Sequence, residues 1–275
     1  MFFENSICLQ CGSPLGFDLE LQTLLTLTPD SGGLVRLDDH TSRYRRCGNQ
    51  LAAQCNWLIP SNSDETLCLS CSLTSVRPND ADSSGRAAFA DAESSKRRLI
   101  HQLFTLKLPV VSRRDDPERG LSFELLSARD GDVITGHESG VITLDLSESD
   151  DAHREFVRQQ LGEAYRTVLG HFRHEIGHYY WPLLVEGAGL LSEFRSLFGD
   201  ETQPYEDARQ QHYNRSRSFD FTHEYVSEYA TMHPWEDWAE TFAHYLHILA
   251  GLDTAQGFGI SVGDPSIEAG RGAFQ

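Results

Sequence analysis

"HFRHEIGHYYW", residues 171–181, is the segment from which the rest of the sequence can be interpreted. Histidines four positions apart on a helix point the same way, so His174 and His178 can hold one zinc ion between them. Such an ion lowers the pKa of a bound water molecule to about 7, and Glu175 can then take its proton. The segment therefore predicts a hydrolytic zinc site, with an ordinary helix that carries two surface histidines as the alternative.

The third zinc ligand is expected from a later helix. The pattern H-E-x-x-H-x-x-G-x-x-H would need glycine at 181 and histidine at 184, but the sequence has Trp181 and Leu184, which excludes that class. In "YATMHPWEDWAETFAHYLH", residues 229–247, Glu236 and Glu240 lie four apart and share a helical face. One can bind zinc while the other accepts the free N–H of a ligand histidine. The spacing alone leaves both assignments open.

This arrangement resembles the gluzincin metallopeptidases, in particular the site of the anthrax lethal factor type. In that type the zinc glutamate opens an E-x-x-x-E segment, and a tyrosine seven residues before it helps to polarise the substrate carbonyl. The resemblance implies that Glu236 is the third zinc ligand and Glu240 the acid beside a ligand histidine. It also implies that Tyr229 stabilises the carbonyl oxygen.

A second resemblance covers nearly the whole chain. Four motifs are similar, in the same order, to a bacterial family of zinc-binding metallopeptidases with an N-terminal zinc ribbon. They are "CNWLIP" (55–60), "VITGHESGVITLDL" (133–146), "YRTVLGHFRHEIGHYYW" (165–181) and "HPWEDWAETFAHYLH" (233–247). The resemblance implies a zincin-like catalytic domain behind a cysteine-rich module.

The six cysteines all fall within the first 71 residues and include two C-x2-C pairs, Cys8/Cys11 and Cys68/Cys71. A secreted disulfide framework is one explanation. The N-terminus, however, has no export signal, and in a reducing compartment such pairs hold zinc through their thiolates. By spacing, Cys47 and Cys55 join Cys68/Cys71 in one compact set, while Cys8/Cys11 with Cys68/Cys71 is the alternative. At least one structural zinc ion is expected beside the catalytic one.

The N-terminal pair raises a further expectation. The family resemblance implies another C-x2-C pair shortly before the segment that begins at Met1. We therefore expect that the natural start lies upstream, and that Cys8 and Cys11 belong to a short ribbon whose other half is encoded there.

The order of the expected elements indicates an α+β fold, because strands come first and helices follow. Residues 1–78 are predicted to form the cysteine-rich zinc-ribbon domain, residues 79–91 a Ser/Asp/Gly-rich linker, and residues 92–275 the zincin-like metallopeptidase domain. Within the last we expect a helix over 92–108, a strand over 121–127, a hairpin within 132–146, one long helix over 151–180, a loop-rich middle, and a final helix over 234–250.

The charge distribution argues against nucleic acid and anionic membranes as partners. Residues 1–119 carry 13 basic and 15 acidic side chains, whereas residues 120–275 carry 10 basic and 26 acidic ones. A domain this acidic repels polyanions. Two basic clusters, "RYRR" (43–46) and "KRR" (96–98), are expected to be solvated surface. No apolar run approaches the ~20 residues that cross a bilayer, and a cytoplasmic location is expected.

Taken together, the sequence predicts a zinc metallopeptidase that cleaves a peptide or protein substrate with Glu175 as general base. The substrate is expected to lie extended beside an edge strand, with "GVITLDL" (140–146) as the candidate. Supporting or structural positions are expected for His137, His171, His233, His244 and His247, and a solvent-facing one for Asp237. The alternatives are a regulatory or scaffold protein that keeps zinc without turnover, and a nucleic-acid-binding ribbon with a passenger domain.

Overall fold

The computed structural model describes residues 3–127, 133, 135–161, 165–214 and 220–260. The chain packs as two compact units, Met1–Phe172 and Arg173–Gln275. The described residues form both helices and sheets, which agrees with the predicted α+β composition. The last part of the predicted catalytic domain, residues 261–275, lies outside the described residues.

The first unit opens with a five-stranded antiparallel sheet in chain order. Its strands are β1 (Leu15–Asp18), β2 (Thr23–Asp30), β3 (Gly33–Arg36), β4 (Arg43–Arg46) and β5 (Leu58–Pro60), followed by the short helix α1 (Leu69–Ser72). Leu25, Leu27, Tyr44 and Leu58 form its buried cluster. The solvated-surface interpretation of residues 43–46 is therefore wrong for Tyr44. Arg46 is also engaged, because it donates to the carbonyl of Leu15 at 2.5 Å.

Helix α2 (Ser83–Thr105) begins inside the segment predicted to be a linker. The side chain of Asp82 accepts the N–H of Gly85 at 3.0 Å, and this N-cap starts the helix well before Ala92. Lys96 and Arg97 of this helix are buried, so the prediction that residues 96–98 are solvated surface is wrong for these two. The domain boundaries themselves stay predictions.

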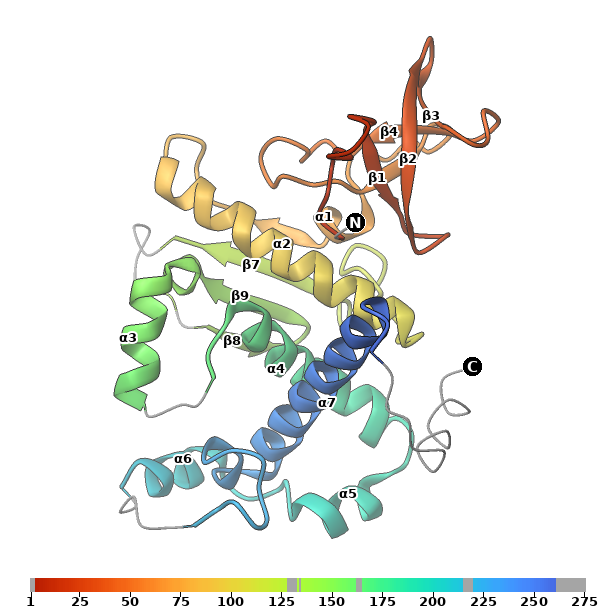
Figure 1. Cartoon of the computed structure of the whole chain (residues 1–275). Helices are drawn as coiled ribbons and strands as arrows, with labels where there is room; N and C mark the ends of the chain where they lie inside the picture. The colour runs from red at the N-terminus through yellow and green to blue at the C-terminus, as the bar shows by residue number, and fades with distance from the viewer. Residues whose placement is uncertain (1–2, 128–132, 134, 162–164, 215–219, 261–275) are drawn as a thin grey trace. The chain divides into compact units, whose positions relative to one another are not determined.

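A second, four-stranded sheet completes the first unit, in the order β6-β7-β9-β8; Figure 1 labels β7, β9 and β8. It contains β6 (Thr74–Val76), β7 (Ser122–Leu126), β8 (Gly136–Glu138) and β9 (Val141–Asp145), of which only β8 runs antiparallel to its neighbour. The predicted strand near 121–127 and the predicted hairpin are confirmed. Asp132 and Ile134, at the start of that hairpin prediction, lie outside the described residues.

The position of β9 contradicts the prediction that it is an edge strand. It pairs with β7 on one side and β8 on the other. Ile142 and Leu144 point into the core and have no exposed surface, so the alternation of the strand reflects a buried face in mid-sheet. An added peptide strand has no free edge there.

The predicted long helix over 151–180 is two helices, α3 (Asp151–Leu161) and α4 (Val168–Trp181). Residues 165–167 are not helical, and residues 162–164 lie outside the described part. The hydroxyl of Thr167 accepts the N–H of Gly170 at 3.0 Å, which starts α4 anew. The guanidinium of Arg166, just before it, bonds the carboxylate of Glu148 at 2.6 Å and 3.1 Å. The helix ends before Pro182, as predicted.

The second unit is helical. After the π-helical turn η3 (Pro182–Glu186) come α5 (Leu191–Phe198), α6 (Tyr205–Asn214), the 3-10 turn η4 (Tyr229–Thr231) and α7 (Pro234–Gly257). The middle is thus less loop-rich than expected, and α7, the long blue helix of Figure 1, extends seven residues beyond Ala250. Among the described residues, no helix combines the length and the apolarity that a membrane crossing requires.

Two candidate metal sites

The first candidate site is formed by Cys47, Cys55, Cys68 and Cys71, all of them buried. Their sulfur atoms lie within 4.8 Å of one another. The Cys55 and Cys68 sulfurs are 3.7 Å apart. Zinc–sulfur bonds of about 2.3 Å in a tetrahedron put sulfurs about 3.8 Å apart, so this spacing fits a tetrathiolate zinc site.

The electrostatics of the four thiols also fit a cation. Hydrogen bonds from the Cys55, Cys68 and Cys71 thiols lower the pKa of Cys47. Burial, by contrast, raises the pKa of Cys68 well above its usual value. Without a metal ion, the surroundings therefore favour deprotonation of one cysteine but oppose deprotonation of the next. The reason is that each further thiolate would add a negative charge to a buried space. A zinc ion removes that conflict.

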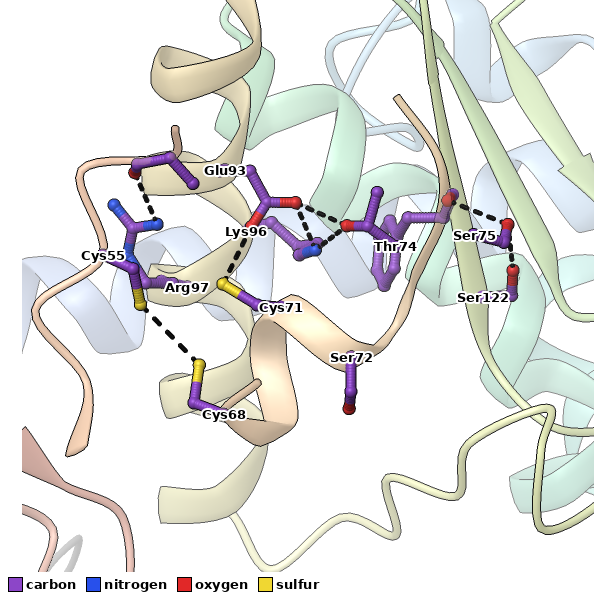
Figure 2. A network of polar contacts seen from close by, with 12 residues as sticks. Cys55, Cys68, Cys71, Ser72, Thr74, Ser75, Glu93, Lys96, Arg97 and Ser122 are labelled. Carbon is purple, nitrogen blue, oxygen red and sulfur yellow. Dashed lines mark hydrogen bonds and ion pairs between the residues drawn. The ribbon is translucent and has the colours of Figure 1, made fainter. Parts of the chain in front are cut away.

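Buried charges from helix α2 surround this cluster (Figure 2). The Cys71 sulfur lies 3.7 Å from a carboxylate oxygen of Glu93, and the other oxygen bonds the Lys96 ammonium at 2.5 Å. The Arg97 guanidinium donates to the Ala53 carbonyl at 3.0 Å. Four thiolates around one zinc ion carry a net charge of about −2. The Glu93 carboxylate adds a further negative charge, so Lys96 and Arg97 offset two of about three buried negative charges.

Cys8 and Cys11 are not brought to the other four. They form a tight turn of their own, in which the Gly12 N–H donates to the Cys8 carbonyl at 2.8 Å and Gly12 adopts φ +71°. Cys11 is exposed and Cys8 half-buried. Within residues 3–127, none of the six cysteines is in a disulfide. The expected upstream partner pair stays a prediction.

The second candidate site lies in the second unit and contains His174, His178 and Glu236. The Nε2 atoms of the two histidines are 3.1 Å apart. The Glu236 Oε2 atom lies 3.0 Å from the first Nε2 and 3.4 Å from the second. Bonds of about 2.0–2.1 Å in a tetrahedron would separate such ligand atoms by about 3.3–3.4 Å. The three donor atoms therefore make one face of a zinc-sized tetrahedron.

Glu240, the other glutamate of α7, determines which nitrogen of His174 is free to bind a metal ion. Glu240 Oε1 lies 2.7 Å from Nδ1 of His174. Burial would raise the pKa of Glu240, but the hydrogen bond to His174, the charge of that ring and smaller contributions from Ser227 and His244 together outweigh it and lower that pKa. The carboxylate is therefore an acceptor, Nδ1 carries the proton, and Nε2 points a lone pair at the site.

Lone pairs that converge so closely require a positive charge between them. Burial opposes protonation of His174, yet the hydrogen bonds to Glu236 and Glu240 and the charges of Glu175 and Glu236 together outweigh it and raise the pKa of His174 well above the usual value. A proton thus satisfies the cluster when no metal ion is bound. The geometry of three donors around one point suits a metal ion better, because each donor can then use its lone pair.

A glycine lets the two helices approach closely enough for this geometry. A Cβ atom at Gly177 would lie 3.0 Å from the Ala239 Cα and 3.3 Å from the Phe242 Cβ. The indole N–H of Trp238 donates to the Gly177 carbonyl at 2.8 Å. Helices α4 and α7 are therefore in backbone contact one turn from the ligands, which sets His174 and His178 beside Glu236.

The predicted catalytic residues lie around these donors. Glu175 is 8% exposed, and burial raises the pKa of its carboxyl, against the opposite influence of His174 and His178. The ring of Tyr229 is 5.9 Å from that of His174. Burial first, and then the charge of Glu236, raise the pKa of the Tyr229 hydroxyl, so it remains a proton donor at neutral pH.

One residue at this site was missed by the sequence interpretation. The hydroxyl of Tyr205, from α6, donates to Glu236 Oε1 at 2.8 Å. Its surroundings, "TQPYEDA", match no metal-site motif, and its distance in sequence from Glu236 follows no helical or strand period. Nothing in the sequence identifies it.

The remaining polar residues mostly have supporting contacts. His137 accepts a turn N–H, His171 lies 3.8 Å from a buried glutamate, and His244 bonds the backbone of its own helix. His247 contacts Arg173, and burial together with that charge lowers the pKa of His247 to about 4. Asp237 is buried, which raises its pKa to about 6, so the prediction that it faces solvent is wrong.

Known proteins place these sites in context. Residues 85–273 match the model of a family described as "Putative zinc-binding metallo-peptidase", and residues 1–82 match that of a zinc-ribbon domain. Uncharacterized proteins of Mycobacterium bovis and of two Mycobacterium tuberculosis strains, CDC 1551 and H37Rv, are each 52% identical to the chain over 260 residues. These matches cover 94% of this chain and 73% of each relative. No solved structure matches the chain.

Proposed function

Because the chain belongs to the bacterial family described as "Putative zinc-binding metallo-peptidase", we propose that it hydrolyses peptide bonds as a gluzincin-like enzyme with a zincin-like catalytic domain. His174, His178 and Glu236 would hold the catalytic zinc ion. The observation that carries the proposal is their spacing, three donor atoms separated by 3.0–3.4 Å, with a buried glutamate next to the first of them.

The residues divide the chemistry between them. A zinc ion in this site would lower the pKa of a bound water molecule and polarise a peptide carbonyl. Glu175 takes the proton of the attacking water and delivers it to the leaving amine, a role for which its raised pKa suits it. Tyr229 donates a hydrogen bond to the carbonyl oxygen. Glu240 holds the tautomer of His174 through the 2.7 Å bond.

The cysteine-rich region supports this function structurally. Cys47, Cys55, Cys68 and Cys71 would hold a second zinc ion without an open position, and Cys8 and Cys11 would contribute to a further ribbon site. The substrate would be a peptide or protein, and a cytoplasmic location suits thiols that stay reduced.

The decisive experiment compares the wild type with Glu175→Gln on a mixed peptide library, with metal content measured in parallel. Glu175→Gln should keep its zinc and fold but lose turnover by ~10²–10⁴-fold, because only proton transfer is removed. Glu186→Gln is the matched control, since Glu186 is an exposed glutamate just after α4. Zinc-replete wild-type protein that cleaves nothing, or a Glu175→Gln variant as fast as wild type, would contradict the proposal. The first outcome would favour a zinc scaffold without turnover.

A further inference from the structure

The two oxygens of Glu236 have different partners. Oε2 faces the imidazole nitrogens of His174 and His178 at 3.0 Å and 3.4 Å. Oε1 accepts the hydroxyl proton of Tyr205 at 2.8 Å. Glu236 is 3% exposed, so water has little access to satisfy Oε1 instead. The tyrosine therefore leaves only one oxygen of this carboxylate for a metal ion.

The hydroxyl of Tyr205 has one proton to give. A phenol has a single proton, and that of Tyr205 is directed to Glu236. The carboxylate therefore supplies the lone pair of this bond, and Oε1 is the atom that the tyrosine occupies. Tyr229 belongs to the same site, with its ring 5.9 Å from that of His174.

The start of helix α6 is tied to the start of α7, which fixes where Tyr205 lies. His233 is 2% exposed and accepts the N–H of Trp235 at its Nδ1, at 3.2 Å. Its Nε2 must then carry the proton, and it donates to the carbonyl of Gln203 at 3.1 Å. The ring of Tyr205 packs on that of His233 with centroids 5.3 Å apart. Tyr205 therefore lies two residues after Gln203, whose carbonyl is bound to His233, and its own ring packs on the same histidine.

We propose that Tyr205 is a positioning residue that restricts Glu236 to one metal-binding oxygen. The inference rests on the proposed function, because it concerns the same metal site. Removing the hydroxyl alone, as in Tyr205→Phe, keeps the ring packed on His233 while it frees Oε1. Both oxygens of Glu236 can then turn toward the metal ion.

Cobalt provides a readout that a purely structural role would not change. Co²⁺ replaces zinc in the full chain, and its visible absorption weakens when the coordination number rises above four. The spectrum of His178→Ala, in which only the thiolate site is intact, is subtracted to isolate the histidine site. Metal affinity at that site is measured by competition with a chelator. Tyr245→Phe, which removes an exposed hydroxyl from α7, is the control.

Tyr205→Phe should weaken metal affinity by ~10–100-fold, the usual effect of losing a partner of a ligand. It should also reduce the cobalt difference absorption and slow turnover. Tyr229→Phe should slow turnover with affinity and spectrum unchanged, because it leaves the bond to Glu236 intact. A wild-type spectrum and affinity in Tyr205→Phe, while Glu236→Ala loses the metal, would overturn the positioning role alone. Wild-type protein without a histidine-type cobalt site would overturn the proposed function as well.

Discussion

Replacing Gly177 by alanine tests whether the contact between α4 and α7 builds the candidate metal site of His174, His178 and Glu236. The added methyl would meet the Ala239 Cα at 3.0 Å and the Phe242 Cβ at 3.3 Å. Carbon atoms normally rest about 3.5–4.0 Å apart. The first of these atoms is backbone and cannot rotate away, so the two helices must separate by a few tenths of an ångström.

Two opposing effects set the change in stability. Alanine in a helix interior is favoured over glycine by about 0.8–1 kcal/mol. Overpacking a close contact costs about 1–3 kcal/mol. The free energy of unfolding of the metal-free protein should therefore fall by about 0–2 kcal/mol.

The effect on metal binding should be larger than the effect on folding, because the ligands come from both helices. If the metal-free variant relieves its strain by separating α4 and α7, zinc must restore the close approach when it binds. A strain of about 1–3 kcal/mol then corresponds to ~5- to 150-fold weaker binding.

The assay is chelator competition for zinc, with urea unfolding of the metal-free protein. Gly251→Ala is the matched control, since Gly251 lies inside α7, is exposed, and has no other side chain or neighbouring backbone within 4 Å of the place a methyl would take. It should stabilise the protein by about 1 kcal/mol and leave zinc affinity unchanged. If Gly177→Ala stabilises as much as Gly251→Ala and binds zinc equally well, the close approach does not hold the site together.

Three further predictions concern the charges and the metals. Lys96→Met should lower the free energy of unfolding, measured in urea, by about 3–5 kcal/mol, because it leaves the Glu93 carboxylate buried without its cation. A Lys96→Met/Glu93→Gln double variant should recover most of the loss. A loss below about 1 kcal/mol in the single variant would contradict this prediction. Cys71→Ser should lose one zinc per chain by metal analysis, and an unchanged zinc content would show that the thiolate cluster binds none. Since the pKa of His174 is raised well above its usual value, the metal-free site is protonated at pH 7 and zinc must displace that proton. The apparent zinc affinity of this site should then rise about tenfold per pH unit as the pH approaches the raised pKa. Calorimetry in buffers of different ionisation enthalpy measures this, and a pH-independent affinity would refute the prediction.

Local features were predictable because their geometry is contained in a single element. His174 and His178 share a face since the helical period brings positions four apart together. The spacing of the later cysteines likewise predicted the set that the structure brings together. The start of α7 and the hairpin of β8 and β9 followed from proline and turn signals in the same way.

Errors arose where a cap or a strand partner decided the outcome. Thr167 starts a new helix through one hydrogen bond to Gly170, which an apolar period does not reveal. The central place of β9 depends on β7, which comes earlier in the chain and pairs with it in parallel. Lys96 was expected in solvent because a lysine is rarely buried, and its contacts with Glu93, Thr74 and the ring of Phe123 make burial tolerable.

The sequence by itself predicted two groups of metal-binding side chains, since a helix and a C-x2-C turn present their side chains by local geometry. It left open which carboxylate faces the histidines, and only resemblance favoured Glu236. The tertiary structure decided this: Oε2 of Glu236 lies against both Nε2 atoms while Glu240 lies on Nδ1 of His174. It also supplied Tyr205, which comes from another helix altogether. The physical reason is that hydrogen bonds between distant elements depend on how the helices pack, and no periodicity within one element encodes that.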